Sequence, residues 1–342
     1  MNREPIPDFL KGVAIFFMMQ IHITELFAKS QVYYSIPGKI SLFLGGVPVA
    51  PLFMALMGYF IIYTGKNSAY IAIRGIKLII IGFLLNIGLN FHLLIKIING
   101  TFQINPWPYV FSVDILPSAG LSLILLSLLI KLRVKTSLQY FAIAIFFVLI
   151  GSYLQDIKTD YQAIKYLQAF FWGTYHWSYF PVFPWFSYTL IGVAFFYAKK
   201  MYANKINLIH VLMLSITVIA IVGGILFGFK ISINLSEYYH HNLFFFLWAV
   251  SFLLTIVLFT NKFYNKIHKN IIDKYIRFLG RNITVVYILQ WIIIGNIATA
   301  IYRTQSLFYS ELWFLVILAL ISFMAFVYNK YKIKRTKKNM FL

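Results

Sequence analysis

The sequence contains no cysteine and only nine Asp and Glu residues among 342. Without cysteine, the chain has no disulfide, no thiolate metal ligand and no cysteine nucleophile. Histidines are also few, and the adjacent His240 and His241 would point about 100° apart on a helix. No carboxylate–histidine spacing accompanies that pair, so we predict no metal site.

Charged residues make up only 11% of the chain, whereas 61% is hydrophobic and 19% aromatic. An ordinary soluble domain could not bury so many long apolar runs. We therefore predict an all-α fold, a polytopic integral membrane helix bundle that forms a single domain over 1–342 with a basic tail at 330–342. Glu4 and Asp8 stand where a signal peptide would be basic, so the first helix is not expected to be cleaved off as a signal peptide. About ten segments approach the roughly 20 residues that a bilayer requires: 9–28, 41–64, 71–95, 109–130, 138–154, 179–198, 207–229, 242–260, 280–301 and 309–329.

The net charge of +21 is distributed unevenly along these segments. If the N-terminus is cytoplasmic, 23 of the 30 Lys and Arg residues fall on the cytoplasmic side, and six of the nine acids fall on the other. This asymmetry follows the positive-inside rule and predicts that both termini are cytoplasmic. The basic charge then indicates the lipid bilayer as a partner and argues against nucleic acid.

An ionisable cluster is expected toward the outer face. His22 and Glu25 are three residues apart in the first apolar segment and share a helix face. Ionisable side chains are costly in hydrocarbon and indicate a functional site by default. We predict His22 as a general base, oriented by Glu25 or by Asp114 near the start of the fourth segment. The alternative is that His22 only hydrogen-bonds a neighbouring helix.

Basic residues are expected toward the inner face, where a phosphorylated donor would approach. Lys11, Arg74, Lys77 and Arg281 are the candidates for holding its phosphates. Other roles stay open, because Lys11 could snorkel to the interface and Arg74 and Lys77 could be topological anchors.

Several motifs resemble known families of membrane acyltransferases. Asp8 and Lys11 followed by His22 resemble the first-helix signature of the acyltransferase-three family. Other stretches are similar to the related heparan-α-glucosaminide N-acetyltransferase and YeiB-like membrane families. These are Pro51–Gly58, Arg74-Gly75 leading to Ile81-Gly82, Phe183–Phe186, and Leu279–Asn282 with Tyr287.

The resemblance implies transfer of an acyl group, usually acetyl from acetyl-CoA, to a hydroxyl or amine of a glycan outside the cytoplasm. It implies that the first-helix histidine is central to this transfer. Two positions depart from the pattern: Lys11 replaces the usual arginine, and Gln290 stands where related proteins often have a histidine. Lysine is a point charge where arginine could bind a phosphate bidentately, which weakens the donor-site assignment. We assign the substrate-binding positions to His176, Trp185, Tyr287 and Gln290, with Trp185 expected at the membrane interface.

The predicted function is therefore a membrane acyltransferase acting on a saccharide or lipid-linked glycan, in the bacterial inner membrane. His22 would act as general base or as an acyl relay. The main alternative is a secondary transporter or flippase that uses His22, Glu25 and Asp114 as a proton relay, although no inverted repeat supports it. A scaffold of an envelope-synthesis complex is a third alternative. The acceptor, the acyl chain and homo-oligomerisation stay open.

Overall fold

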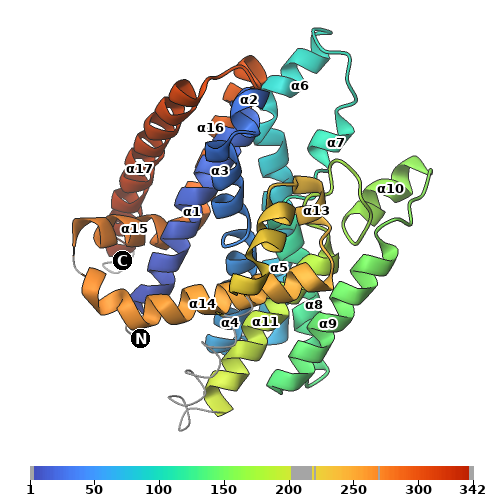
Figure 1. Cartoon of the computed structure of the whole chain (residues 1–342), viewed down its shortest axis with the longest axis vertical. Coiled ribbons are helices and arrows are strands. Elements are labelled where there is room, and N and C mark those ends of the chain that lie inside the picture. Colours follow the sequence, from blue (N-terminus) through green and yellow to red (C-terminus); the bar gives the residue numbers. More distant parts are fainter. Residues whose placement is uncertain (1–3, 202–217, 219–220, 269, 339–342) are drawn as a thin grey trace.

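The computed structural model describes residues 4–201, 218, 221–268 and 270–338. These residues form helices joined by short loops, with two isolated β-bridges, Ala28 to Gln305 and Val113 to Ser178. The all-α membrane bundle predicted from composition is confirmed (Figure 1). In chain order the helices are α1 (Pro5–Leu26), α2 (Ser30–Tyr33), α3 (Ile36–Gly46), α4 (Ala50–Tyr63), α5 (Ser68–Leu89), α6 (Phe91–Ile98), α7 (Trp107–Val110), α8 (Ile115–Lys131), α9 (Ser137–Leu154), α10 (Gln162–Ala169), α11 (Val182–Met201), α13 (Leu235–Tyr239), α14 (Leu243–Ile267), α15 (Ile271–Arg281), α16 (Ile283–Ile301) and α17 (Leu307–Lys338).

Seven helical stretches of the described chain are long and apolar enough to cross a membrane. They begin at Pro5, Ile36, Ser68, Ser137, Leu243, Ile283 and Leu307. Three further predicted segments correspond to α8, to α11, and to a helix over Ile221–Ser232. Most of the predicted span 207–229 lies outside the described residues.

Two predicted spans are broken or shortened by identifiable residues. The segment 41–64 is two helices, because Pro51 at the start of α4 has no N–H with which to continue α3. The segment 109–130 becomes helical only at Ile115, because the Asp114 side chain caps α8 by accepting a hydrogen bond from the Ile115 N–H at 2.7 Å. The loop before it pairs with a distant segment instead: the Val113 N–H donates to the Trp177 carbonyl, and the Phe180 N–H donates to the Val113 carbonyl.

The predicted span 280–301 is also corrected at its start. Arg281 ends α15, a separate amphipathic helix, and α16 begins only after Asn282. In Figure 1, α14 runs across the bundle, whereas α1 and α17 run along it. The start of α1 and the end of α17 lie on the same lower side of that view.

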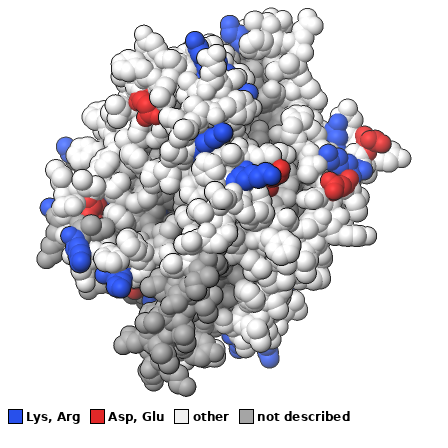
Figure 2. Space-filling model, in the orientation of Figure 1, with Lys and Arg blue, Asp and Glu red and all other residues white. Residues whose placement is uncertain are grey.

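Glycines allow several helix pairs to touch backbone to backbone, as is usual where helices pack in membranes. A Cβ at Gly12 would overlap the Ile276 carbonyl, and one at Gly280 would overlap the Asp8 carbonyl, so α1 and α15 are in direct contact. Gly75 and Gly120 join α5 to α8 in the same way. The outer surface of the bundle carries few charges, and those on the face in Figure 2 occur in small scattered groups.

Candidate active site

His22 lies against Trp291 of α16. The two rings have centroids 3.9 Å apart and an angle of 30° between their planes. The Nδ1 atom of His22 is buried and has no hydrogen-bond partner, whereas Nε2 is not enclosed and also has none. The Trp291 ring therefore fixes the imidazole plane while leaving Nε2 accessible for a proton transfer.

Tyr287 and Asp114 extend this contact to α8. The Tyr287 hydroxyl donates a hydrogen bond of 2.6 Å to the Asp114 Oδ2, and both side chains are buried. Tyr287 also interacts with Trp291, one turn further along the same helix. A chain of contacts thus links His22, Trp291, Tyr287 and Asp114, and it joins three helices that are far apart in sequence.

Two further polar side chains at this site lack partners. The Glu25 Oε1 is buried without a hydrogen bond, although the carboxylate lies within electrostatic range of Arg303 and Asp114. Gln290 is fully buried, and neither its amide nitrogen nor its oxygen has a partner. We call His22, Glu25, Asp114, Tyr287, Gln290 and Trp291 the His22 cluster. Native structures rarely leave buried polar groups unpaired, so this concentration indicates a site that accommodates water or a ligand.

Arg303 is placed beside Glu25 by the connection between α16 and α17. Its backbone N–H donates to the Leu26 carbonyl at 2.9 Å, and Gln305 forms a β-bridge with Ala28, just after the end of α1. The guanidinium lies over the rings of Tyr33 and Tyr302, at 5.5 and 5.4 Å from their centroids. This residue supplies a positive charge to a site whose other charged groups are carboxylates.

Two tyrosines outside the spanning helices lie within electrostatic range of Glu25. Tyr179 and Tyr239 meet edge to face at 5.3 Å, and burial together with the Glu25 charge raises the pKa of both hydroxyls. Both therefore stay protonated hydrogen-bond donors at neutral pH. Tyr179 is nonetheless 40% exposed, so part of its side chain borders an open space within the protein.

Trp185 is enclosed within the bundle and does not face lipid. It is fully buried among aromatic rings, and its Nε1 donates to the Tyr239 carbonyl at 2.8 Å. Its indole ring packs in the protein core because the start of α11 lies against the end of α13, which carries Tyr239. The hydrogen bond holds Tyr239 in place, and the role of Trp185 in substrate binding stays a prediction.

His241, His240 and His176 differ from His22 in their surroundings. His241 is buried, with Nδ1 2.7 Å from the Tyr238 carbonyl and Nε2 2.9 Å from the Tyr188 hydroxyl. Since Nδ1 must donate to the carbonyl, Nε2 accepts from Tyr188, and the ring is neutral and fully paired. Burial lowers the pKa of both His240 and His241 to about 4. His176 is exposed and packs its edge against Trp177 at 4.7 Å.

The inner cations fall into two groups. Arg281 contacts the buried Asp8 at 3.4 Å and remains about half exposed. Lys11 lies one turn after Asp8, with its ammonium 4.6 Å from the centre of the Phe60 ring. The contact between α1 and α15 thus brings Lys11 and Arg281 to the same end of the bundle.

Arg74 and Lys77 are exposed on α5, whose glycine face packs on α8. Lys77 shares its side of the helix with the exposed Ile73, Ile80 and Leu84. Neither cation forms an ion pair within the described residues. Lys77 therefore has the surroundings of a side chain that snorkels from lipid to the interface.

Comparison of the chain with known protein families identifies one that it matches. The family model of the heparan-alpha-glucosaminide N-acetyltransferase catalytic region matches residues 3–223, which is more than half of the chain. The chain belongs to this family. No curated protein and no solved structure matches it. Membership of the heparan-alpha-glucosaminide N-acetyltransferase family identifies a membrane acetyltransferase in general and confirms the resemblance inferred from the motifs.

The matched region includes α1, α8 and the loop containing Tyr179 but ends before Tyr239, Tyr287 and Trp291. Sequence reasoning missed Trp291, Tyr179, Tyr239 and Arg303. Trp291 carried a signal, because it lies one turn after the motif residue Tyr287. Nothing in the sequence indicated which of the 24 tyrosines would lie within electrostatic range of Glu25.

Proposed function

We propose that the chain transfers an acetyl group from acetyl-CoA to a hydroxyl or amine of an extracytoplasmic saccharide or lipid-linked glycan, with His22 as the general base. The observation that carries this proposal is the state of the His22 ring. It is held in plane by Trp291, and its Nε2 is accessible and without a hydrogen bond. A histidine retained only for packing would have its nitrogens paired, as His241 has.

The chemistry requires one proton transfer and one exchange of bonds. The acceptor hydroxyl or amine attacks the thioester carbonyl carbon while its proton passes to His22 Nε2. A C–O or C–N bond forms, the C–S bond breaks, and the CoA thiolate receives the proton from the imidazolium. Glu25 and Asp114 stabilise the transient positive charge on His22, since opposite charges nearby favour the ionised form. The Tyr287 hydroxyl orients Asp114 for this role.

The two substrates approach from opposite sides in this proposal. Lys11 and Arg281 bind phosphates of the CoA nucleotide, which is too highly charged to enter hydrocarbon. Tyr179 and Tyr239 present O–H donors to the acceptor, as expected of side chains that bind a saccharide. Gln290 contributes hydrogen bonds inside the cavity without titrating.

The direct test is release of CoA by the purified full-length protein. Because the chain has no cysteine, a thiol reagent detects released CoA without a background from the protein. His22→Ala should lower turnover by about 10²- to 10⁴-fold, the usual contribution of a general base. The matched control is His92→Gln, because His92 hydrogen-bonds Asn296 on α16, outside the His22 cluster, and its substitution should leave turnover intact. Normal turnover in His22→Ala, or substrate transport by reconstituted protein without CoA release, would refute the proposal.

A second measurement separates direct transfer from an acyl relay. In a relay the acetyl group moves first to His22 Nε2, and CoA leaves before the acceptor reacts. Incubation with acetyl-CoA alone should then add one acetyl mass to wild-type protein and none to His22→Ala. Absence of this adduct in an active preparation would favour direct transfer.

A further inference from the structure

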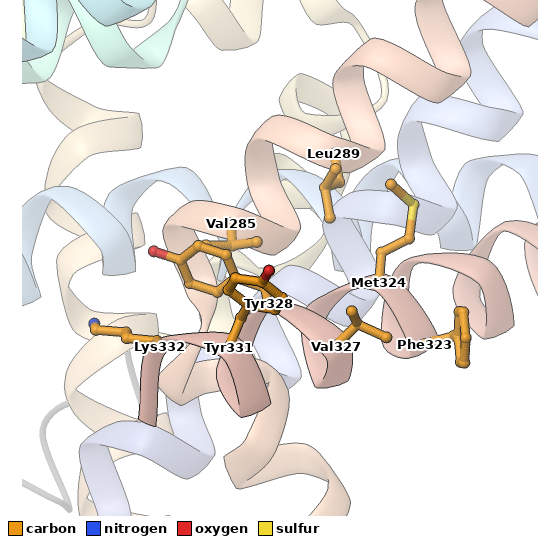
Figure 3. A pocket seen from close by; sticks show the side chains of 8 residues that line it. All are labelled: Val285, Leu289, Phe323, Met324, Val327, Tyr328, Tyr331 and Lys332. Atoms are coloured by element: carbon orange, nitrogen blue, oxygen red, sulfur yellow. The ribbon is translucent and has the colours of Figure 1, made fainter. Parts of the chain in front are cut away.

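A groove of about 560 Å³ separates α16 from α17 on the surface of the bundle. Val285 and Leu289, four residues apart, form the α16 wall, and two adjacent rows of side chains form the α17 wall. Figure 3 shows Phe323 and Met324 at one end of the α17 row and Lys332 at the other. The groove is therefore apolar along its length and basic at one end.

Both walls belong to helices that are long and apolar enough to span a membrane. The groove side chains of α17, including Met324 and Val327, are exposed on the protein surface. In a bilayer this surface faces hydrocarbon, and an unfilled groove would lose van der Waals contacts along its lining. A lipid acyl chain has the shape and polarity to occupy it.

The basic end of the groove favours one class of lipid headgroup. Lys332 and the Tyr331 hydroxyl belong to the last part of α17, where the spanning stretch ends. The sequence continues with Lys334, Arg335, Lys337 and Lys338, so the local charge is strongly positive. Such juxtamembrane basic segments attract anionic lipid. An ammonium and a phenolic hydroxyl are both donors to phosphate oxygens.

We propose that the groove binds one anionic phospholipid from the leaflet at the C-terminal end of α17. An acyl chain lies between Val285, Leu289 and Val327, and the headgroup phosphate contacts Lys332 and Tyr331. The site is separate from the His22 cluster and does not depend on the transfer reaction. A lipid bound in the groove contacts α16, the helix that also carries Tyr287 and Trp291.

Native mass spectrometry of the full-length protein tests this proposal. The protein is mixed with equal amounts of phosphatidylglycerol and phosphatidylcholine with the same acyl chains, and inorganic phosphate is tested separately. Wild-type protein should retain one phosphatidylglycerol in preference to phosphatidylcholine. Lys332→Gln should lower that preference about fivefold, the equivalent of about 1 kcal/mol for one basic side chain near an anionic headgroup. The matched control is Lys330→Gln, an exposed lysine two residues away that does not line the groove, and its preference should equal that of wild type.

A second variant tests the acyl-chain part of the groove. Leu289→Trp fills the space between the helices and should abolish retention of both lipids. If this variant does not fold, Lys332→Gln still decides the question. Equal retention of the two lipids by wild type, equal effects of the Lys330 and Lys332 substitutions, or equal stabilisation by inorganic phosphate would overturn the proposal. A lipid-free dimer that Leu289→Trp disrupts would also overturn it, because a second copy would then occupy the groove.

Discussion

Two groups of buried polar side chains lie toward opposite ends of α1, and they differ in how completely their hydrogen bonds are satisfied. At the first, Asp273 accepts three hydrogen bonds from Arg277 and one from Tyr264, and its backbone N–H is capped by Asn270. At the second, the His22 cluster leaves atoms of His22, Glu25 and Gln290 without partners. A fully paired buried network specifies a fold, whereas a partly paired one is costly unless a ligand completes it. The first group therefore serves stability, and the second is available for chemistry.

The same contrast holds between two buried histidines. His241 has both nitrogens paired, whereas His22 has neither paired and packs its ring against Trp291. Substitutions at the two groups should therefore separate loss of stability from loss of activity.

Asp273→Ala should lower the free energy of unfolding by about 3–5 kcal/mol, because it removes one partner of a buried ion pair. Chemical denaturation in detergent measures the loss, and turnover per folded molecule should persist. Glu237→Ala is the control, since that residue is exposed and its carboxylate accepts a hydrogen bond from Asn234. Unchanged stability in Asp273→Ala would remove the distinction between the two groups.

Acid should destabilise the protein through His241. The pKa of His241 is about 4 in the folded chain and about 6.5 when unfolded. Above pH 6.5 the ring is neutral in both states and adds no pH dependence. Between pH 6.5 and 4 the unfolded chain binds the proton first, so stability should fall by up to about 3 kcal/mol.

Melting temperatures measured from pH 8 to 4.5 should show this fall. His241→Gln should make that part of the profile shallower and leave the fall that His240 contributes, whereas His176→Gln, at an exposed ring, should preserve the whole profile. Parallel profiles for wild type and His241→Gln would contradict the assignment of a neutral, buried His241.

Tyr287→Phe should lower kcat by about tenfold to a hundredfold, because hydrogen bonds to charged groups are worth about 1.5–3 kcal/mol. The KM for acetyl-CoA should change little, since Tyr287 lies at the His22 cluster and not among the inner cations. Steady-state kinetics with varied acetyl-CoA separates the two constants. A pure KM effect would place Tyr287 in donor binding.

Lys11→Gln should raise the KM for acetyl-CoA about fivefold to tenfold, as expected for one contact to a phosphate. Lys77→Gln should have a smaller effect, because Lys77 lies on a surface of α5 that carries exposed isoleucine and leucine. If both substitutions raised the KM for acetyl-CoA equally, Lys77 would belong to the donor site, as the sequence predicts. If neither substitution changed the KM for acetyl-CoA, the result would count against the approach of the two substrates from opposite sides.

Hydropathy predicted the bundle because spanning helices must be long and apolar, and His22 was identifiable because a histidine is costly in such a helix. The sequence did not reveal that His22 meets Trp291, since their contact depends on how α1 and α16 pack. The burial of Trp185 could not be predicted for a related reason: a tryptophan at the start of an apolar segment has the same local sequence whether it faces lipid or core. The late start of α8 could have been predicted, because Asp114 is a strong helix cap.

The contact of α1 with α15 at Gly12 and Gly280 offers a way to observe the site in motion. Because the two backbones touch there, α15 and α1 should move as one body. Ile271 and Ile272 at the start of α15 are exposed, and the chain has no native cysteine to compete for a label. A fluorophore or spin label on a single cysteine introduced there would report the movement of the helix that carries His22, without any modification inside the cavity.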